Sequence, residues 1–248
     1  MELEICIDRM LSARAAAAGG ADRLEVCSAL ELGGLTPSIG LIESVRAEIS
    51  LPIHAMIRPR AGGFVYDEDE RAVMIRDVQS VAKRGIAGVV FGVLTPGGTI
   101  DFEFVNELVQ AAAGLHCTFH RAIDCALSPA AELERLASSG VGRVLSSGCS
   151  TTALDGASEL AVMCEKAPAG LTVMAGAGLH SGNLAELLRR TGVSHVHGSA
   201  ARTVRTHDKV LPGRVTFAEL EDGLPCERQT SESEVRAMRL IMDEWTVE

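Results

Sequence analysis

Short apolar segments rich in β-branched residues recur along the chain, and stretches with helical periodicity separate them. These segments predict strands at residues 2–7, 22–27, 52–57, 87–92, 115–120, 142–147, 170–175 and 194–199. Strands that alternate with helices form a parallel sheet, and eight is the number of strands that closes a barrel. The pattern therefore predicts an α/β protein with the (β/α)8 TIM-like barrel fold, in one domain over residues 1–248.

The part of the chain after the last predicted strand is less regular. We expect residues 203–230 to form a long loop that crosses the rim of the barrel. Ser231 and Glu234 have the spacing of a capping box, and apolar residues with helical spacing follow them. The sequence therefore predicts a C-terminal helix over residues 231–246 that seals the barrel.

Several predicted strands carry polar residues at alternate positions, although strands buried on both faces should be apolar. The polar residues of one parity are Glu4, Cys6, Glu25, Cys27, His54, Arg58, His116, His120, His195 and His197. Because an unpaired buried charge is costly, we expect Glu4, Glu25 and Arg58 to pair with one another. Their convergence on the rim where barrel enzymes hold their active sites favours a functional site. A charge network that only fills the barrel is the alternative.

The segment FHRAID, residues 119–124, places His120 at a strand end with Arg121 and Asp124 after it. A histidine there can act as a general acid or base, and an arginine can orient a carboxylate or a phosphate. The other candidate catalytic residues are Glu4, Glu25, Arg58 and His197. This set suits an enzyme that acts on a small anionic or phosphorylated metabolite. A salt bridge between neighbouring loops would explain Arg121 and Asp124 equally well.

Two glycine-rich segments, MAGAG at 174–178 and HGSA at 197–200, end the last two predicted strands. Barrel enzymes often bind phosphate at this place, through backbone amides and the start of a short helix. The candidate anion-binding residues are Gly176, Gly178, Gly198 and Ser199. Tight turns that the fold requires are the alternative.

The tetrapeptides LEIC at 3–6 and LEVC at 24–27 lie on strands that should be neighbours. Adjacent strands are about 4.8 Å apart, so Cys6 and Cys27 would come within reach of one soft metal ion. Thiolates suit Cu(I). Free cysteine is more often a small buried hydrophobic residue, which is the alternative for this pair.

The composition of the chain limits the binding partners and the cellular compartment that we expect for the protein. A formal net charge of −10 disfavours nucleic acid and an anionic membrane surface, since both require clustered Lys and Arg. The N-terminus lacks the features of a signal peptide, and no apolar run is long enough to span a bilayer. Seven cysteines without a CxxC pair fit a reducing compartment. We therefore expect a cytoplasmic protein whose partner is a copper ion or a small anion, with a homo-oligomer left open.

A set of motifs is similar to those of the copper homeostasis protein CutC family. The matching stretches, in order, are LEIC, GGADRLEVC (19–27), GGLTPS (33–38), IRPRAGGF (57–64), TFHRAID (118–124), RVLSSG (143–148), MAGAG and HGSA. The resemblance covers the chain to about residue 205 and implies a (β/α)8-like barrel, a cytoplasmic location and a role in copper handling. It also implies Cu(I) binding at the positions of Cys6 and Cys27. The chain departs from the family pattern at 61–63 and 146–148, and the match is weak beyond 205.

Overall fold

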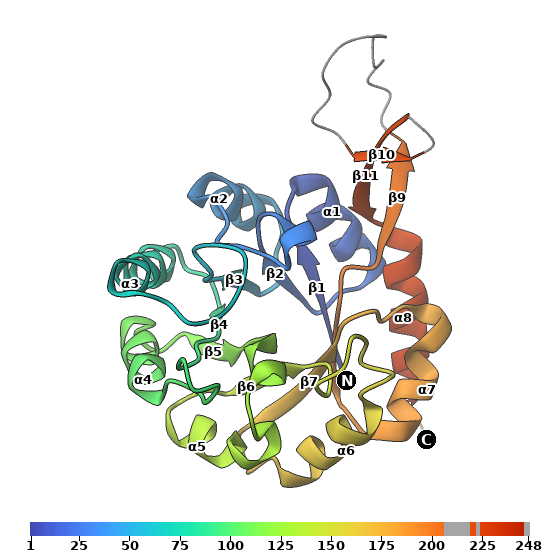
Figure 1. The fold of residues 1–248 in the computed structure, drawn as a ribbon. Helices are drawn as coiled ribbons and strands as arrows, with labels where there is room; N and C mark the ends of the chain where they lie inside the picture. The colour runs from blue at the N-terminus through green and yellow to red at the C-terminus, as the bar shows by residue number, and fades with distance from the viewer. Residues whose placement is uncertain (206–218, 222–223, 246–248) are drawn as a thin grey trace.

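Eight parallel strands close into a barrel in the computed structural model, which describes residues 1–205, 219–221 and 224–245 (Figure 1). The strands are β1 (Glu2–Ile7), β2 (Arg23–Val26), β3 (Ile53–Met56), β4 (Gly88–Phe91), β5 (His116–Phe119), β6 (Arg143–Ser146), β7 (Thr172–Gly176) and β8 (His195–Gly198). β8 pairs with β1, which closes the sheet. The predicted TIM-like barrel is confirmed, and every strand overlaps its predicted range.

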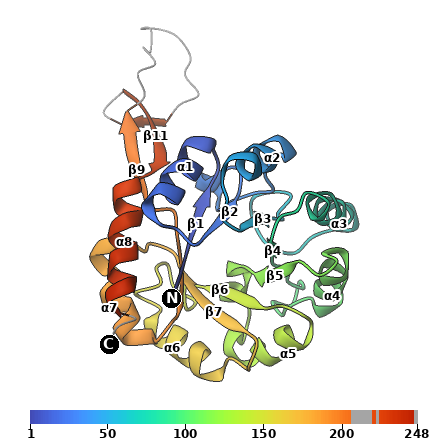
Figure 2. The ribbon, with the colours of Figure 1, turned by 180° about the vertical axis from the view of Figure 1, so that it is seen from behind.

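A ring of helices surrounds the barrel, as the views from the front and from behind show (Figure 1 and Figure 2). They are α1 (Met10–Gly19), α2 (Ile39–Glu48), α3 (Glu68–Ala82), α4 (Phe102–Ala111), α5 (Leu133–Ser138), α6 (Ala157–Lys166), α7 (Ser181–Thr191) and α8 (Glu232–Trp245). Short 3-10 turns lie at η1 (Leu30–Leu32), η2 (Arg121–Cys125) and η3 (Pro129–Ala131). None of the helices in the described part of the chain has the length and apolar character needed to cross a membrane.

The hydrophobic core lies between the strands and the surrounding helices. Leu3, Ile5 and Ile7 of β1 are fully buried and belong to this core, as do Val89 and Phe91 of β4. Successive side chains of a strand point to opposite faces, so the other parity of each strand lines the inside of the barrel. These inward-facing side chains include the polar residues identified in the sequence. The alternation along the strands therefore places the candidate site inside the barrel.

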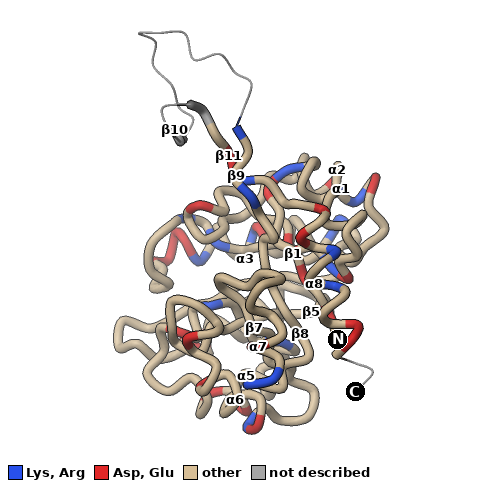
Figure 3. Tube along the Cα trace, turned by 90° about the vertical axis from the view of Figure 1, so that its right-hand side faces the viewer, with Lys and Arg blue, Asp and Glu red and all other residues tan. Residues whose placement is uncertain are grey.

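The residues after β8 form a small antiparallel sheet where the sequence predicted an irregular loop across the rim. Its strands are β9 (Ala201–Arg205), β10 (Glu219–Glu221) and β11 (Leu224–Thr230), in the order β10-β11-β9. This arm, defined as β9, β10 and β11, stands beside α1 and away from the barrel axis (Figure 1 and Figure 3). Pairing between β9 and β11 satisfies backbone groups that a loop would leave to solvent. Residues 206–218, 222–223 and 246–248 lie outside the described residues.

Helix α8 packs between α1 and α7 and completes the ring of helices (Figure 2). Val235, Met238 and Met242 are buried on one face of this helix. They have the spacing that places side chains on one helical face, as the sequence indicated.

Candidate functional site

The carboxyl ends of the barrel strands open into a cavity of about 970 Å³. Of the candidate residues from the sequence, those that line it are Cys6, Glu25, Cys27, Arg58, His120, Arg121, Gly178, His197, Gly198 and Ser199. Glu4, Asp124 and Gly176 are not among the lining residues. The barrel therefore gathers most of the predicted residues around one space.

Cys6, Glu25 and His197 form the floor of this cavity. Their ligand atoms, one from each residue, all lie within 4.8 Å of one another. The strand register brings them together, because Cys6 of β1 is opposite Glu25 of β2, and β8 pairs with the other edge of β1. His197 Nε2 lies 3.7 Å from Glu25 Oε2. Among the described residues, these three side chains have metal-ligating atoms that lie close enough together to hold one metal ion.

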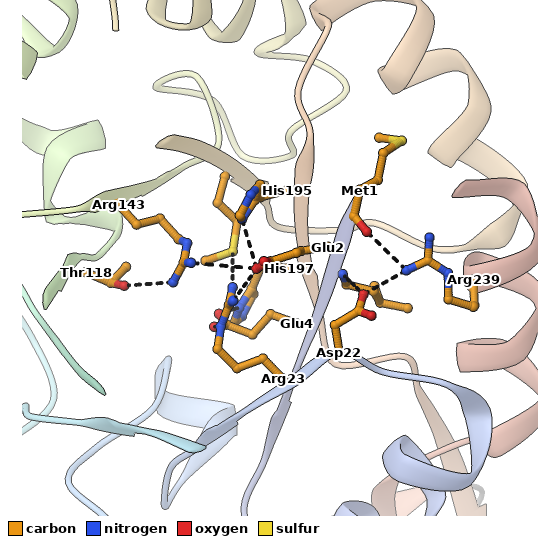
Figure 4. A network of polar contacts seen from close by, with 12 residues as sticks. Met1, Glu2, Glu4, Asp22, Arg23, Thr118, Arg143, His195, His197 and Arg239 are labelled. Atoms are coloured by element: carbon orange, nitrogen blue, oxygen red, sulfur yellow. Dashed lines mark hydrogen bonds and ion pairs between the residues drawn. The ribbon is translucent and has the colours of Figure 1, made fainter. Parts of the chain in front are cut away.

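Below the floor, Glu4 fixes the orientation of His197. Its Oε1 lies 2.8 Å from His197 Nδ1, and its Oε2 accepts a hydrogen bond from Arg23 Nε (Figure 4). Arg23 also forms an ion pair with Glu2, whose side chain is partly exposed to solvent (Figure 4). A carboxylate on one imidazole nitrogen leaves the other nitrogen directed toward the floor, as in metal-binding histidines.

The charges on the floor depend on one another. Burial raises the pKa of Glu25 to about 7, although the nearby His197 opposes this increase. Burial alone would lower the pKa of His197, but Cys6, Glu25 and Glu4 raise it well above its usual value. The pKa of Glu4 is held well below its usual value, because its contacts with His197 and Arg23 outweigh its burial. At neutral pH, Glu4 is therefore a carboxylate and His197 an imidazolium.

The predicted pairing of Arg58 with Glu4 and Glu25 is wrong. Arg58 donates to the backbone carbonyls of Leu32, Gly34 and Gly62, and its guanidinium lies 5.1 Å from the centre of the Phe64 ring. It lies two residues beyond the end of β3, and its side chain therefore reaches the loops above the barrel. Arg23, which the sequence reasoning missed, takes the place expected for Arg58. It has the same parity as Glu25 on β2, so the alternation of side chains could have identified it.

The His120 ring lines the cavity and is held in one tautomer. Its Nδ1 accepts a hydrogen bond from the backbone N–H of Ala122, and its ring packs against Phe64. Burial, with Arg58 nearby, lowers the pKa of His120 to about 3. The neutral ring must therefore carry its proton on Nε2, which is buried without a hydrogen-bond partner in the described structure. This geometry fits a donor better than a general base.

Asp124 and Arg121 join η2 to the loop after β6. The Asp124 carboxylate accepts hydrogen bonds from Ser147 N and Oγ, from Ser146 Oγ and from Arg121 Nε. Arg121 Nη2 also donates to Ser147 Oγ. The arrangement matches the structural alternative for this pair, a link between neighbouring loops. Arg121 still lines the cavity with part of its side chain.

A carboxylate of the chain itself occupies the start of α7, next to the proposed anion site. Glu234 Oε1 accepts a hydrogen bond from Ser181 N at 2.6 Å, and Oε2 accepts one from Ser181 Oγ at 3.1 Å. Glu234 therefore does not form the capping box with Ser231 that its spacing predicted. Gly176 has a packing role, since a Cβ there would lie 2.7 Å from Leu145 Cδ1.

Cys27 directly follows the last residue of β2, two residues after Glu25. It is therefore not opposite Cys6 in the pairing of β1 with β2. Its Sγ is 3.4 Å from Glu25 Oε2, and it packs with Met56 and Val90. Burial raises the pKa of this thiol well above its usual value. The repeated tetrapeptide suggested two facing thiols, but the stagger of β1 and β2 places Glu25 opposite Cys6 instead.

Comparison with known proteins identifies the family. A model described as CutC family matches residues 1–202. The chain belongs to the CutC family. A CutC protein from Photobacterium profundum is 42% identical over 84% of both chains, and one from Porphyromonas gingivalis is 44% identical over 80% of both.

A solved structure agrees with this assignment. A protein from Streptococcus agalactiae, provisionally named a copper homeostasis protein CutC, has a TM-score of 0.76 and 28% identity, over 80% of this chain and 98% of that one. A thiamine phosphate pyrophosphorylase from Pyrococcus furiosus has a TM-score of 0.56 at 16% identity and shares the fold alone. Most of the arm and all of α8 lie beyond the part that the CutC family model matches.

Proposed function

We propose that this CutC protein binds copper as Cu(I) at the floor of the cavity, through Cys6 and His197, with Glu25 as a third ligand. The observation that carries the proposal is the approach of the three ligand atoms to within 4.8 Å of one another. A thiolate and an imidazole suit copper, and the Glu4 carboxylate behind His197 is the outer partner expected for a histidine ligand. The ion would be held on one side and face an open cavity on the other.

Proton release accompanies metal binding in this proposal. A metal ion binds the neutral imidazole, so it must displace one proton of His197. Since the pKa of His197 is raised well above its usual value, protons compete with the ion at neutral pH. The affinity for Cu(I) should therefore increase as the pH rises.

Cys27 is the candidate fourth donor. Its Sγ approaches the same Glu25 carboxylate that contributes to the floor. Its surroundings of Met56 and Val90 are apolar, which disfavours a free thiolate. We expect its contribution to copper affinity to be smaller than that of Cys6.

Competition with a Cu(I) chelator under anaerobic conditions tests the proposal. Cys6→Ser should weaken Cu(I) binding by at least about 100-fold, because it removes a direct ligand. Cys27→Ser should weaken it less, and Cys125→Ser, at an exposed cysteine, should leave it unchanged. If the wild type and Cys6→Ser bind Cu(I) with equal affinity, the proposed copper site at the floor of the cavity is refuted.

A second candidate function, acid–base catalysis on a small molecule, is favoured by the size of the cavity. A volume of about 970 Å³ is typical of small-molecule sites and far exceeds what one ion needs. Glu25 and His197 would exchange protons with the molecule, and His120 Nε2–H would donate a hydrogen bond to it. A screen of metabolites for thermal stabilisation, followed by turnover assays, tests this candidate. Turnover that survives both Glu25→Gln and His120→Ala would refute it.

A cytoplasmic location is part of the proposal. All seven cysteines are unpaired in the structure, which supports a reducing compartment.

A further inference from the structure

The floor of the cavity also has the arrangement of a nucleophile, a base and an orienting carboxylate. Glu4 Oε1 lies 2.8 Å from His197 Nδ1, behind the ring (Figure 4). The opposite nitrogen, Nε2, faces the floor, and the ligand atoms of Cys6 and His197 lie within 4.8 Å of each other. A cysteine, a histidine and a group that orients the histidine form the catalytic unit of thiol-dependent acyl-transfer enzymes. Such groups are often farther apart before substrate binds than in the reacting complex.

Of the two cysteines among the described lining residues, Cys6 is the one that a molecule can reach. Cys27 is fully buried, whereas Cys6 is 8% exposed and the side chain of His197 is 12% exposed. A hydrogen bond from Cys6 Sγ to Gly198 O, at 3.6 Å, holds the thiol next to β8, the strand that carries His197. The thiol and the imidazole therefore meet the cavity at one place.

The strand register fixes this arrangement. Glu4 and Cys6 lie two positions apart on β1, so both side chains point into the barrel at successive levels. β8 pairs with β1 and places His197 opposite Glu4. The imidazole therefore spans the step from the carboxylate to the thiol. Because all three residues belong to barrel strands, their positions are more precise than those of residues on loops.

Apolar side chains beside the imidazole suit an acyl group. A Cβ added at Gly176 would lie 2.7 Å from Leu145 Cδ1 and 3.3 Å from His197 Cδ2, so the Leu145 side chain lies next to the His197 ring. Leu145 and Met56 line the cavity together with Cys6. The cavity of about 970 Å³ accommodates a small molecule, and these side chains would contact its hydrocarbon part.

We propose that Cys6 is a nucleophile that accepts the acyl group of a small ester or thioester, with His197 as general acid and base and Glu4 as the positioning residue. The Cys6 sulfur, whose proton passes to His197 Nε2, attacks the acyl carbon and forms a carbon–sulfur bond. The bond to the leaving group breaks, and the leaving oxygen or sulfur keeps the electron pair and takes the proton from His197. Water then attacks the acyl carbon while His197 accepts a water proton, and the electron pair of the carbon–sulfur bond returns to Cys6. The products are a carboxylic acid and an alcohol or a thiol.

This covalent chemistry goes beyond both functions proposed above. It uses the sulfur that would bind copper, so a bound Cu(I) ion should block it, but it does not require copper. The acid–base function, in turn, does not require an acyl group on Cys6. The three functions can therefore fail separately.

Acylation of the metal-free protein under anaerobic conditions tests the proposal. The probes are p-nitrophenyl acetate, an ester, and S-acetyl-N-acetylcysteamine, a thioester, and the faster of the two identifies the preferred leaving group. The background Cys125→Ser/Cys149→Ser removes the two exposed cysteines. Peptide mapping by mass spectrometry follows acetylation of each remaining thiol. Cys6 should be acetylated at least about 100-fold faster than Cys164, although Cys164 is the more exposed of the two.

Variants separate the roles of the residues. Cys6→Ser should abolish the fast acetylation and the turnover of the preferred probe. Glu4→Gln should lower the maximal acylation rate by at least about tenfold and leave the half-saturating probe concentration nearly unchanged, because Glu4 acts on the His197 ring and not on the substrate. Glu2 pairs with the same Arg23 but approaches His195, so Glu2→Gln should react like the wild type.

Three results would overturn the proposal. They are acetylation of Cys6 no faster than that of Cys164, equal maximal rates in Glu4→Gln and Glu2→Gln, and an acetyl group on Cys6 that water does not remove. An equimolar amount of Cu(I) should suppress the fast acetylation. Fast acetylation that Cu(I) does not suppress would support the nucleophile and contradict only the copper site at the floor.

Discussion

Replacement of Glu4 by glutamine tests whether the buried network supports the floor of the cavity. The Glu4 side chain is fully buried, with one carboxylate oxygen bound to Arg23 and the other to His197. Glutamine has nearly the same size and can still accept one of these hydrogen bonds. The variant Glu4→Gln therefore removes a charge rather than volume.

The expected cost follows from the burial of the ion pair. Removal of one partner of a buried pair costs about 3–5 kcal/mol. Arg23 keeps its contact with Glu2, so we expect the lower end of this range, which corresponds to a decrease in Tm of roughly 6–12 °C for a chain of this size. Loss of the charge behind a histidine ligand should also weaken Cu(I) binding by about 10- to 100-fold.

The pH dependence of this effect has a defined sign. The folded-state pKa of Glu4 is held well below the ordinary value of 4.5. A carboxylate of this kind stabilises the fold above its unfolded pKa, and the stabilisation is lost as the pH falls through the folded value. The difference in Tm between the wild type and Glu4→Gln should therefore shrink once the pH drops below about 4.

The matched control is Glu2→Gln. Glu2 pairs with the same arginine, Arg23, but its side chain is 45% exposed, and the histidine it approaches is His195, not His197. We expect a loss of less than about 1 kcal/mol and unchanged copper affinity. Thermal unfolding and chelator competition measure both quantities. A folded Glu4→Gln protein with wild-type copper affinity, or an equally large effect of Glu2→Gln, would refute the role assigned to Glu4.

Other regions of the site can be tested in the same way. Asp124→Asn should lower the free energy of unfolding in urea by about 2 kcal/mol, since the carboxylate accepts hydrogen bonds from Ser147 and Arg121. Gly92→Ala should displace the His120 ring and lower the Tm, because the added Cβ would lie 2.3 Å from it. His120 should stay neutral with its proton on Nε2 at pH 5, as measured by ¹⁵N NMR, since its pKa is lowered to about 3. A His120 titration near pH 6.5 would contradict that environment.

The fold could be predicted because its signals are local and repeated. Apolar side chains such as Ile5 and Val89 recur at one parity and pack under the helices, while the other parity lines the barrel. The gathering of Glu25, His120 and His197 around one cavity followed from the same alternation. These features depend only on neighbours in the sequence and on a barrel with eight strands.

The remaining features depend on register and on distant contacts. Two similar tetrapeptides suggested that Cys6 faces Cys27, but the offset between β1 and β2 places Glu25 opposite Cys6. The capping-box spacing of Glu234 is a local signal, and a contact with Ser181 on another helix replaced it. The pairing of β9 with β11 likewise joins segments that are far apart in the chain, so no local sequence pattern predicted the arm.

Anomalous diffraction from crystals exposed to Cu(I) without oxygen tests the central claim most directly. Data collected above and below the copper absorption edge would locate the ion independently of any variant. We predict one anomalous peak in each chain, in bonding contact with Cys6 Sγ and His197, with Glu25 beside it. Copper found only at exposed thiols such as Cys125 and Cys149, with no peak at the floor of the cavity, would contradict the proposed copper site.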